Sequence, residues 1–222
     1  MQTIAELLAQ ELGASPVHVQ NVIDLLDQGN TIPFIARYRK ELHGSMDDTA
    51  LRKLEDRLNY LRNLEQRRQE VKSAIEGQEK LTPELAAAID SARTLAEVED
   101  LYRPYKQKRR TRATVAREKG LAPLAELLLG QRRDCPDPMQ AAQGFIDPEK
   151  EVETVADALQ GANDIVAELL SDDAAIRKTL RELLRRQGRL RSLATGEEDS
   201  VYRLYYDFEQ LLPKLAGHQI MA

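Results

Sequence analysis

The chain has 222 residues and a formal net charge of −5, with 42% apolar and 31% charged residues and no Trp. Many Leu, Ala, Arg and Glu residues beside only 11 Gly are typical of a mostly helical protein. No apolar run approaches the roughly 20 residues that a membrane-spanning helix needs, and the N-terminal sequence lacks the basic start and apolar core of a secretory signal. Because Cys135 is the single cysteine, an intrachain disulfide is excluded. We therefore expect a cytoplasmic protein that does not enter a membrane.

The first thirty residues predict two short helices joined by a tight turn. Apolar residues recur at helical spacing over residues 3–12, and Gly13 ends this segment. Ser15 and Pro16 supply a cap and a first turn for a second helix, which ends near Gly29. In the sequence TIPFIARYRKE that follows, a proline is expected to interrupt any helix.

Leucines at three- and four-residue steps predict a long helix over about 48–76, which Asp47 or Asp48 can cap. Such a helix is roughly 40 Å long. One apolar stripe on a helix of this length requires a partner helix, so we expect a coiled-coil-like helical hairpin. Thr82 and Thr94 mark the starts of the returning helices.

Further helix signals follow downstream. The segments TVAREKG and LAPLAELLLG predict two short helices separated by Gly120, which is a helix-turn-helix pattern in the general sense. Another helix is expected to begin at Asp147 and Pro148. A cap at Asp172 then begins a helix that ends near Gly188.

Together these signals predict an all-α fold, an elongated module of many helices with helix-turn-helix elements and the long helical hairpin. We expect an N-terminal helical region over residues 1–130. A second helical region is expected over residues 131–222.

One segment, LYRPYKQKRRTR at residues 101–112, contains six cations and no acid. Positive charge gathered in this way within an acidic chain indicates an anionic partner, inside or outside the molecule. Arginine and lysine bind phosphate oxygens, and the adjoining Tyr102 and Tyr105 can stack on exposed bases. Alternatively, the two tyrosines pack in the core and the cations form salt bridges with the preceding acids, Glu97, Glu99 and Asp100.

Charge counts keep both interpretations open. Residues 81–100 are acidic and residues 101–120 basic, and the same alternation recurs over residues 149–175 and 176–191. The candidates for nucleic-acid binding are Lys106, Lys108, Arg109, Arg110 and Arg112. Secondary candidates are Arg37, Arg39 and Lys40.

No catalytic constellation emerges from the sequence. His18, His43 and His218 are far apart, and none has a metal-binding spacing. There is no glycine-rich phosphate loop and no nucleophile elbow. We therefore expect a protein that is not an enzyme and has neither a cofactor nor a metal site.

Two long blocks resemble a known family. The sequences NTIPFIARYRKELHGSMDD and EDLYRPYKQKRRTRATVAREKGLAPLA are similar to the N-terminal region of the Tex family, bacterial transcription accessory proteins with an RNA-binding S1 domain. Family members are several times longer and continue into an RNase H-like domain of the YqgF type. The resemblance therefore implies an N-terminal piece that ends before that domain.

The resemblance implies a non-catalytic helical module of a transcription accessory protein that binds nucleic acid, either RNA or DNA. RNA polymerase or other transcription proteins are further expected partners. In the alternative, the module is a scaffold that docks on the transcription machinery or on the protein's own other domains, without binding nucleic acid itself.

Overall fold

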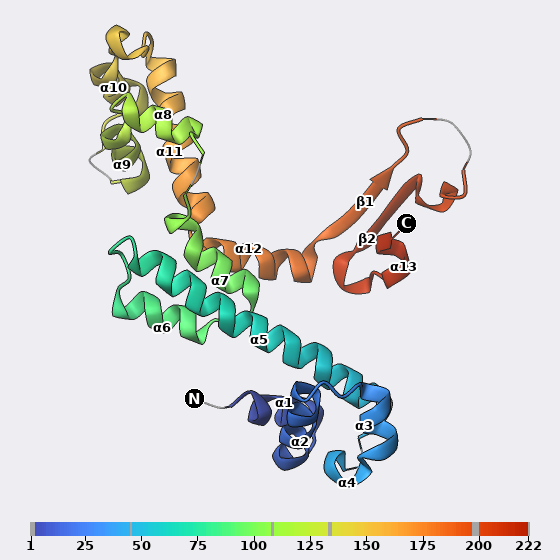
Figure 1. The fold of residues 1–222 in the computed structure, drawn as a ribbon. Helices are drawn as coiled ribbons and strands as arrows, with labels where there is room; N and C mark the ends of the chain where they lie inside the picture. Colours follow the sequence, from blue (N-terminus) through green and yellow to red (C-terminus); the bar gives the residue numbers. More distant parts are fainter. Residues whose placement is uncertain (1–2, 45, 108, 133–134, 197–199, 222) are drawn as a thin grey trace. The chain divides into compact units, whose positions relative to one another are not determined.

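The structure, a computed structural model, describes residues 3–44, 46–107, 109–132, 135–196 and 200–221. Most of these residues are helical, and two short strands pair near the C-terminal end (Figure 1). The chain forms two compact units, Met1–Val98 and Glu99–Ala222. The division at residue 130, which rests on sequence pattern alone, stays a prediction.

Short helices packed on one long helix build the first unit. Side-chain caps begin the first helix and the long helix: the Thr3 side chain and Glu6 form a capping box, and the Asp47 carboxylate accepts a hydrogen bond from the Ala50 N–H at 2.7 Å. The elements are α1 (Ile4–Leu12), α2 (Pro16–Asp27), α3 (Ile32–Tyr38), α4 (Lys40–His43), α5 (Asp48–Glu76), α6 (Pro83–Ser91) and, across the boundary between the units, α7 (Leu95–Tyr102).

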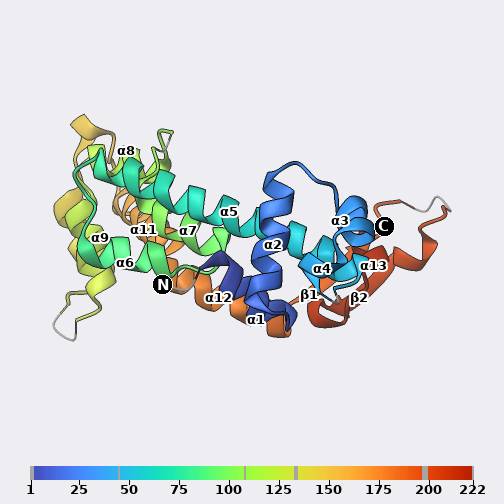
Figure 2. The ribbon, with the colours of Figure 1, turned by 60° about the horizontal axis from the view of Figure 1, so that its bottom comes forward.

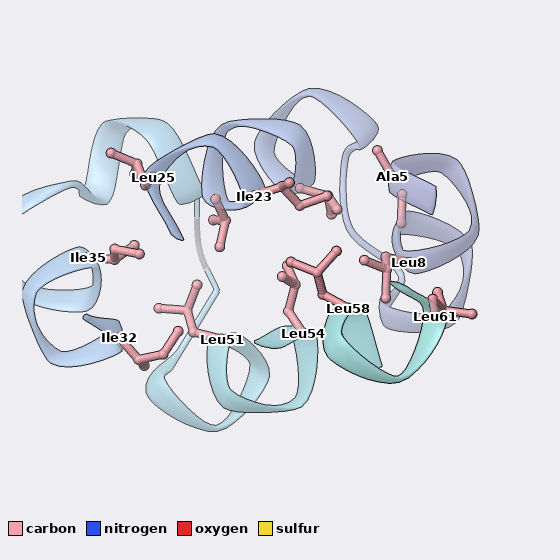
Figure 3. Packing of buried hydrophobic residues seen from close by; sticks show 13 residues of the cluster. Ala5, Leu8, Ile23, Leu25, Ile32, Ile35, Leu51, Leu54, Leu58 and Leu61 are labelled. Carbon is pink, nitrogen blue, oxygen red and sulfur yellow. The ribbon is translucent and has the colours of Figure 1, made fainter. Parts of the chain in front are cut away.

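The core of this unit lies between α5 and the first three helices (Figure 3). The leucines that the sequence assigned to one stripe of α5 are all buried. Those in the first half of the helix, from Leu51 to Leu61, pack in one cluster with Leu8 of α1, Val22 of α2 and Ile35 of α3. Burial of this apolar surface is the main contribution to the stability of the unit.

The predicted long helix is confirmed as α5. Its second half packs against α6, where the Lys72 ammonium lies 2.7 Å from the Asp90 carboxylate and Arg68 donates to the carbonyl of Ala92 at 2.6 Å. Since α6 has nine residues, the coiled-coil-like character of this hairpin stays a prediction.

A correction concerns Pro33, which does not interrupt a helix. It occupies the first turn of α3, where its missing N–H has no partner to lose and its fixed φ suits the helix. Ile32 and Ile35 then point into the core, so the apolar half of this segment anchors the helix.

The second unit contains a helical core and a separate strand pair (Figure 2). In the core, α11 packs on α8, α9 and α10. The elements after α7 are α8 (Arg112–Glu118), α9 (Ala122–Gly130), α10 (Pro138–Ala142), α11 (Val155–Asp172), α12 (Ala174–Gln187), β1 (Arg189–Leu193), β2 (Asp207–Leu211), α13 (Gly217–Met221), and short 3-10 turns at Arg103–Tyr105, Gln143–Phe145, Pro148–Lys150, Arg203–Tyr205 and Leu212–Lys214.

Gly161 sets the closest approach of α11 to its neighbours. A Cβ atom at this position would lie 2.3 Å from Leu121 Cδ1 and 3.3 Å from the Cβ of Ala116. Both neighbours are buried. The absent side chain therefore lets α8 and the start of α9 pack closely on α11.

Two predicted helix starts are wrong. Pro148 begins a 3-10 turn, and α11 starts only after Thr154, which forms a capping box with Asp157. Asp172 is the last residue of α11, and its neighbour Asp173 caps α12 by accepting from the Ile176 N–H at 2.8 Å. Asp147 caps only that 3-10 turn, by accepting from the Glu149 N–H at 3.2 Å, whereas the Thr154 and Asp173 side chains accept from backbone N–H groups of α11 and α12 themselves.

The all-α prediction does not hold near the C-terminal end. β1 and β2 pair antiparallel, with Arg189 opposite Leu211 and Leu193 opposite Asp207. Every residue of β1 is exposed. A strand without a buried face has no apolar alternation that the sequence could reveal.

Candidate nucleic-acid interface

The basic segment, defined here as residues 106–112, follows α7 and reaches the first residue of α8. A 3-10 turn at Arg103–Tyr105 ends the preceding helix. At the other end, the Thr111 hydroxyl accepts a hydrogen bond from the Thr114 N–H at 3.0 Å and caps α8. Of the described cations, Lys106, Arg109 and Arg110 lie on a loop and Arg112 is the first residue of α8, so their side chains do not share one helix face.

The structure leaves the described cations of this segment exposed. Arg110 pairs with Glu118 at 2.8 Å while its side chain is 70% exposed, and Arg112 lies 3.7 Å from Asp164 while 85% exposed. Within the described part of the chain, Lys106 and Arg109 have no ion pair. The candidate Lys108 lies outside the described residues.

Exposed pairs of this kind contribute about 0–1 kcal/mol each. A phosphate group can therefore replace either carboxylate at little cost. A groove of about 430 Å³ runs beside these pairs and is lined by both Arg112 and Asp164. Because its lining carries both signs of charge, the groove itself does not favour an anion. The positive charge that a ligand can reach is that of the exposed cations of the basic segment.

Other cations near the basic segment form ion pairs with acids that are less exposed than the cations themselves. Arg103 donates to Asp172 at 2.9 Å, and Arg117 donates to Glu168 at 2.7 Å. Glu168 also accepts from the Thr111 hydroxyl. Both acids belong to α11 and are half-buried, so these contacts fix the ends of the basic segment on that helix.

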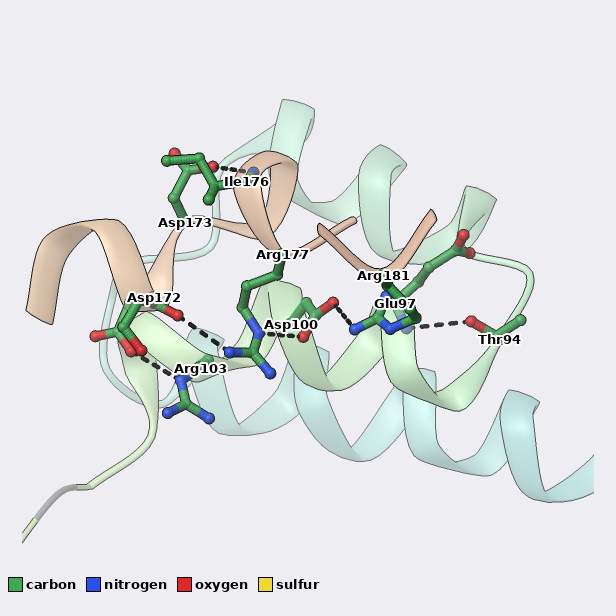
Figure 4. Close-up of polar contacts among 10 residues, drawn as sticks. Thr94, Glu97, Asp100, Arg103, Asp172, Asp173, Ile176, Arg177 and Arg181 are labelled. Carbon is green, nitrogen blue, oxygen red and sulfur yellow. Dashed lines mark hydrogen bonds and ion pairs between the residues drawn. The ribbon is translucent and has the colours of Figure 1, made fainter. Parts of the chain in front are cut away.

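Among the described acids of the second unit, Asp100 of α7 is the most deeply buried, with 5% of its surface exposed. Its carboxylate accepts a hydrogen bond from Arg177 Nε at 2.6 Å and another from Arg181, both on α12 (Figure 4). Burial alone raises the pKa of Asp100, but the hydrogen bonds and charges of the two guanidinium groups outweigh burial and lower that pKa below its ordinary value of 3.8.

Ion pairs of the described residues therefore join charged blocks that are far apart in sequence. The basic block at 101–120 contacts acids of the block at 149–175. The basic block at 176–191 contacts Asp100 of the first acidic block. In that acidic block, Glu97 accepts from the backbone N–H of Arg93 at 2.6 Å and serves its own helix start.

The two tyrosines beside the basic segment, Tyr102 and Tyr105, are half-buried. Each also takes part in a further polar or ring contact. They are thus neither fully in the core nor freely available as stacking surfaces.

The secondary candidates Arg37, Arg39 and Lys40 are exposed at the junction of α3 and α4. Among the described residues, none of the three forms an ion pair, although Glu41 follows them directly. The guanidinium groups of Arg37 and Arg39 instead lie over aromatic rings: Arg37 is 5.9 Å from the ring centre of Tyr38, and Arg39 is 5.4 Å from that of Phe34. Phe34 itself is half-buried.

Neither a metal-binding group nor a membrane-spanning helix occurs among the described residues. They bring no three His, Cys, Asp or Glu side chains into a group that could hold a metal ion. None of their helices combines the length and apolar character needed to cross a membrane.

The fold and these surfaces define a mostly helical, charge-rich module. Residues 2–76 match the Tex-like protein N-terminal domain, and residues 134–222 match the Tex central region-like family. The chain belongs to the Tex family and contains its N-terminal and central regions.

Similar proteins are several times longer than this chain. It is 46% identical over 218 residues to Protein tex of Bordetella pertussis, with 97% of the chain and 27% of that protein covered. It is 41% identical over 222 residues to Transcriptional accessory protein Tex of Neisseria gonorrhoeae, with 99% and 29% covered. The S1 RNA-binding domain-containing protein 1 of Homo sapiens is 27% identical over 230 residues, with 99% and 23% covered. The chain thus spans less than a third of these relatives.

Proposed function

We propose that this chain is a non-catalytic helical module of a transcription accessory protein and that it binds nucleic acid. The relative from Neisseria gonorrhoeae carries the name of a transcriptional accessory protein, and the human relative is named for an RNA-binding domain. In this proposal the ligand of the whole protein is RNA or DNA, and RNA polymerase or another transcription protein is a further partner.

The observation that carries the proposal is the accessibility of the basic segment. Lys106 and Arg109 are exposed and form no ion pair in the described part of the chain. Arg110 and Arg112 form ion pairs in which the arginine side chain is solvent-exposed. Three cations on a loop and a fourth, Arg112, at the start of α8 can follow the spacing of phosphates along a strand and release the counterions bound there. Contacts of this kind carry little sequence information, so we propose binding without strong base preference.

The helix pairs around Gly13 and Gly120 belong to the same proposal as helix-turn-helix elements. Both glycines have positive φ, 63° and 85°, which permits a tight turn between consecutive helices. In this proposal the two helix pairs hold the candidate cations in place, and no helix of either pair is inserted into a groove of the nucleic acid.

A gel-shift titration at low salt tests the proposal. The chain should shift both single-stranded and duplex oligonucleotides, and added salt should weaken binding steeply. A chain that is folded by circular dichroism yet shifts neither kind of oligonucleotide at low salt contradicts nucleic-acid binding by this module.

A second candidate function is a scaffold that docks on the transcription machinery or on further domains of the same protein. The exposed apolar residues of α12, which include Leu180 and Leu184, favour it. Here the double charge reversal Arg109→Glu and Arg110→Glu lowers partner recovery or the free energy of unfolding and leaves oligonucleotide affinity unchanged. A large loss of oligonucleotide affinity in the same variant supports the first function instead.

A further inference from the structure

The exposed side of α3 holds a compact group of flat side chains, named here the α3 platform: Phe34, Arg37, Tyr38 and Arg39. The rings of Phe34 and Tyr38 lie with centres 5.3 Å apart and planes tilted by 46°. The guanidinium of Arg39 lies 5.4 Å from the Phe34 ring centre, and that of Arg37 lies 5.9 Å from the Tyr38 ring centre.

The fold of the first unit places this platform on the surface. Ile32 and Ile35 are buried against α5, and their burial fixes the orientation of the short helix α3. The side chains one turn apart at 34 and 38 then share a face. Tyr38 is 57% exposed, although a large aromatic side chain contributes most to stability when buried.

The charge of the platform is not compensated locally. Arg37, Arg39 and the adjacent Lys40 are exposed, and the described residues offer none of them a carboxylate within ion-pair distance. Arg52 and Arg62, on the neighbouring α5, are each paired with an acid. Positive charge that has been left unpaired beside an exposed ring complements a ligand that is both anionic and flat.

We propose that the α3 platform binds unpaired bases of single-stranded nucleic acid. A base stacks on Tyr38 or on the guanidinium plane of Arg37, and Arg39 and Lys40 contact the adjoining phosphates. In a duplex the faces of the bases are covered by their neighbours, so only an unpaired strand can use the ring. This inference rests on the proposed nucleic-acid binding and adds base stacking at a second surface.

An acidic peptide is the other ligand that the cations could attract. It carries the charge but lacks the planar faces that an exposed tyrosine and guanidinium groups recognise. The geometry therefore favours a nucleic acid, and polyglutamate serves as the competing ligand in the test.

The test measures binding of a short fluorescein-labelled oligoadenylate by anisotropy, using the whole chain and its Tyr38→Leu variant. Stacking predicts a loss of affinity of about fivefold or more in the variant. Tyr202→Leu is the matched control, because Tyr202 is 52% exposed and lies in the second unit. Circular dichroism and urea midpoints of both variants should equal those of the wild type.

A second probe separates stacking from phosphate contact. An abasic strand of the same length keeps the phosphates and lacks the bases. The wild type should therefore bind the abasic strand more weakly than oligoadenylate. The wild type and the Tyr38→Leu variant should bind the abasic strand with equal affinity. If the wild-type chain binds oligoadenylate and the Tyr38→Leu variant binds it equally well, base stacking on the α3 platform is refuted and the proposed function stands. If the wild type binds no oligonucleotide, both fail. Tyr38-dependent binding of polyglutamate alone also overturns the inference.

Discussion

The carboxylate of Asp100 accepts a hydrogen bond at 2.6 Å from the guanidinium of Arg177, which lies 77 residues further along the chain. Arg181 donates to the other oxygen of the same carboxylate. One nearly buried acid thus holds the first turns of α12 against the second half of α7. The buried charge depends on both donors, because an unpaired carboxylate at this depth would lose its hydration without compensation.

Asp100→Asn should lower the free energy of unfolding by about 1–3 kcal/mol. The substitution removes the negative charge and leaves two guanidinium groups facing a neutral amide. Urea unfolding followed by circular dichroism measures the effect. The matched control is Glu118→Gln, whose partner is the exposed Arg110 and whose change should stay within about 0.5 kcal/mol. Equal losses in the two variants would contradict a special role for Asp100.

The same carboxylate makes stability dependent on acid. Because the folded pKa of Asp100 is lowered, its contribution is fully present above the unfolded pKa and is lost as pH falls through the folded pKa. Stability of the wild type should therefore fall below about pH 4, and Asp100→Asn should lack part of that decline. Urea midpoints between neutral pH and about pH 2 provide the measurement. If the urea midpoints of the two proteins fell with pH in parallel, the assignment of this acid dependence to Asp100 would be refuted.

Packing at Gly161 gives a prediction that is independent of charge. Gly161→Val should destabilise the chain by about 1–3 kcal/mol, since the new side chain meets buried Leu121 and Ala116. Gly144→Val is the control, because a Cβ atom at Gly144 meets nothing within 4 Å. Thermal unfolding should show a large shift for the first variant and a small one for the second.

Much of the fold could be predicted from local sequence signals. The leucine spacing gave α5 its bounds and its buried face, and Thr82 caps α6 by accepting from the Leu85 N–H at 3.2 Å. These features depend on residues within one or two turns of each other. The strand pair could not be predicted in this way, because β1 is exposed throughout and its partner β2 follows only after a long connection.

The candidate site was predictable in composition but not in its contacts. Counting charges identified the basic segment and left its partners open, with the preceding acids Glu97, Glu99 and Asp100 as one alternative. The pair of Arg103 with Asp172 spans 69 residues, and only the packing of the second unit brings such groups together. The aromatic contact of Arg39 with Phe34 was missed for another reason: an aromatic residue beside buried isoleucines usually belongs to the core.

The most direct test of nucleic-acid binding is the salt dependence of oligonucleotide affinity for the double variant Lys106→Gln and Arg109→Gln. Two lost phosphate contacts should make the slope of log K against log salt shallower by about 1.4 to 1.8. The control, Lys53→Gln with Lys178→Gln, removes the same charge from other exposed positions and should keep the wild-type slope. An unchanged slope in the first variant, or an equal change in both, would contradict binding through the basic segment.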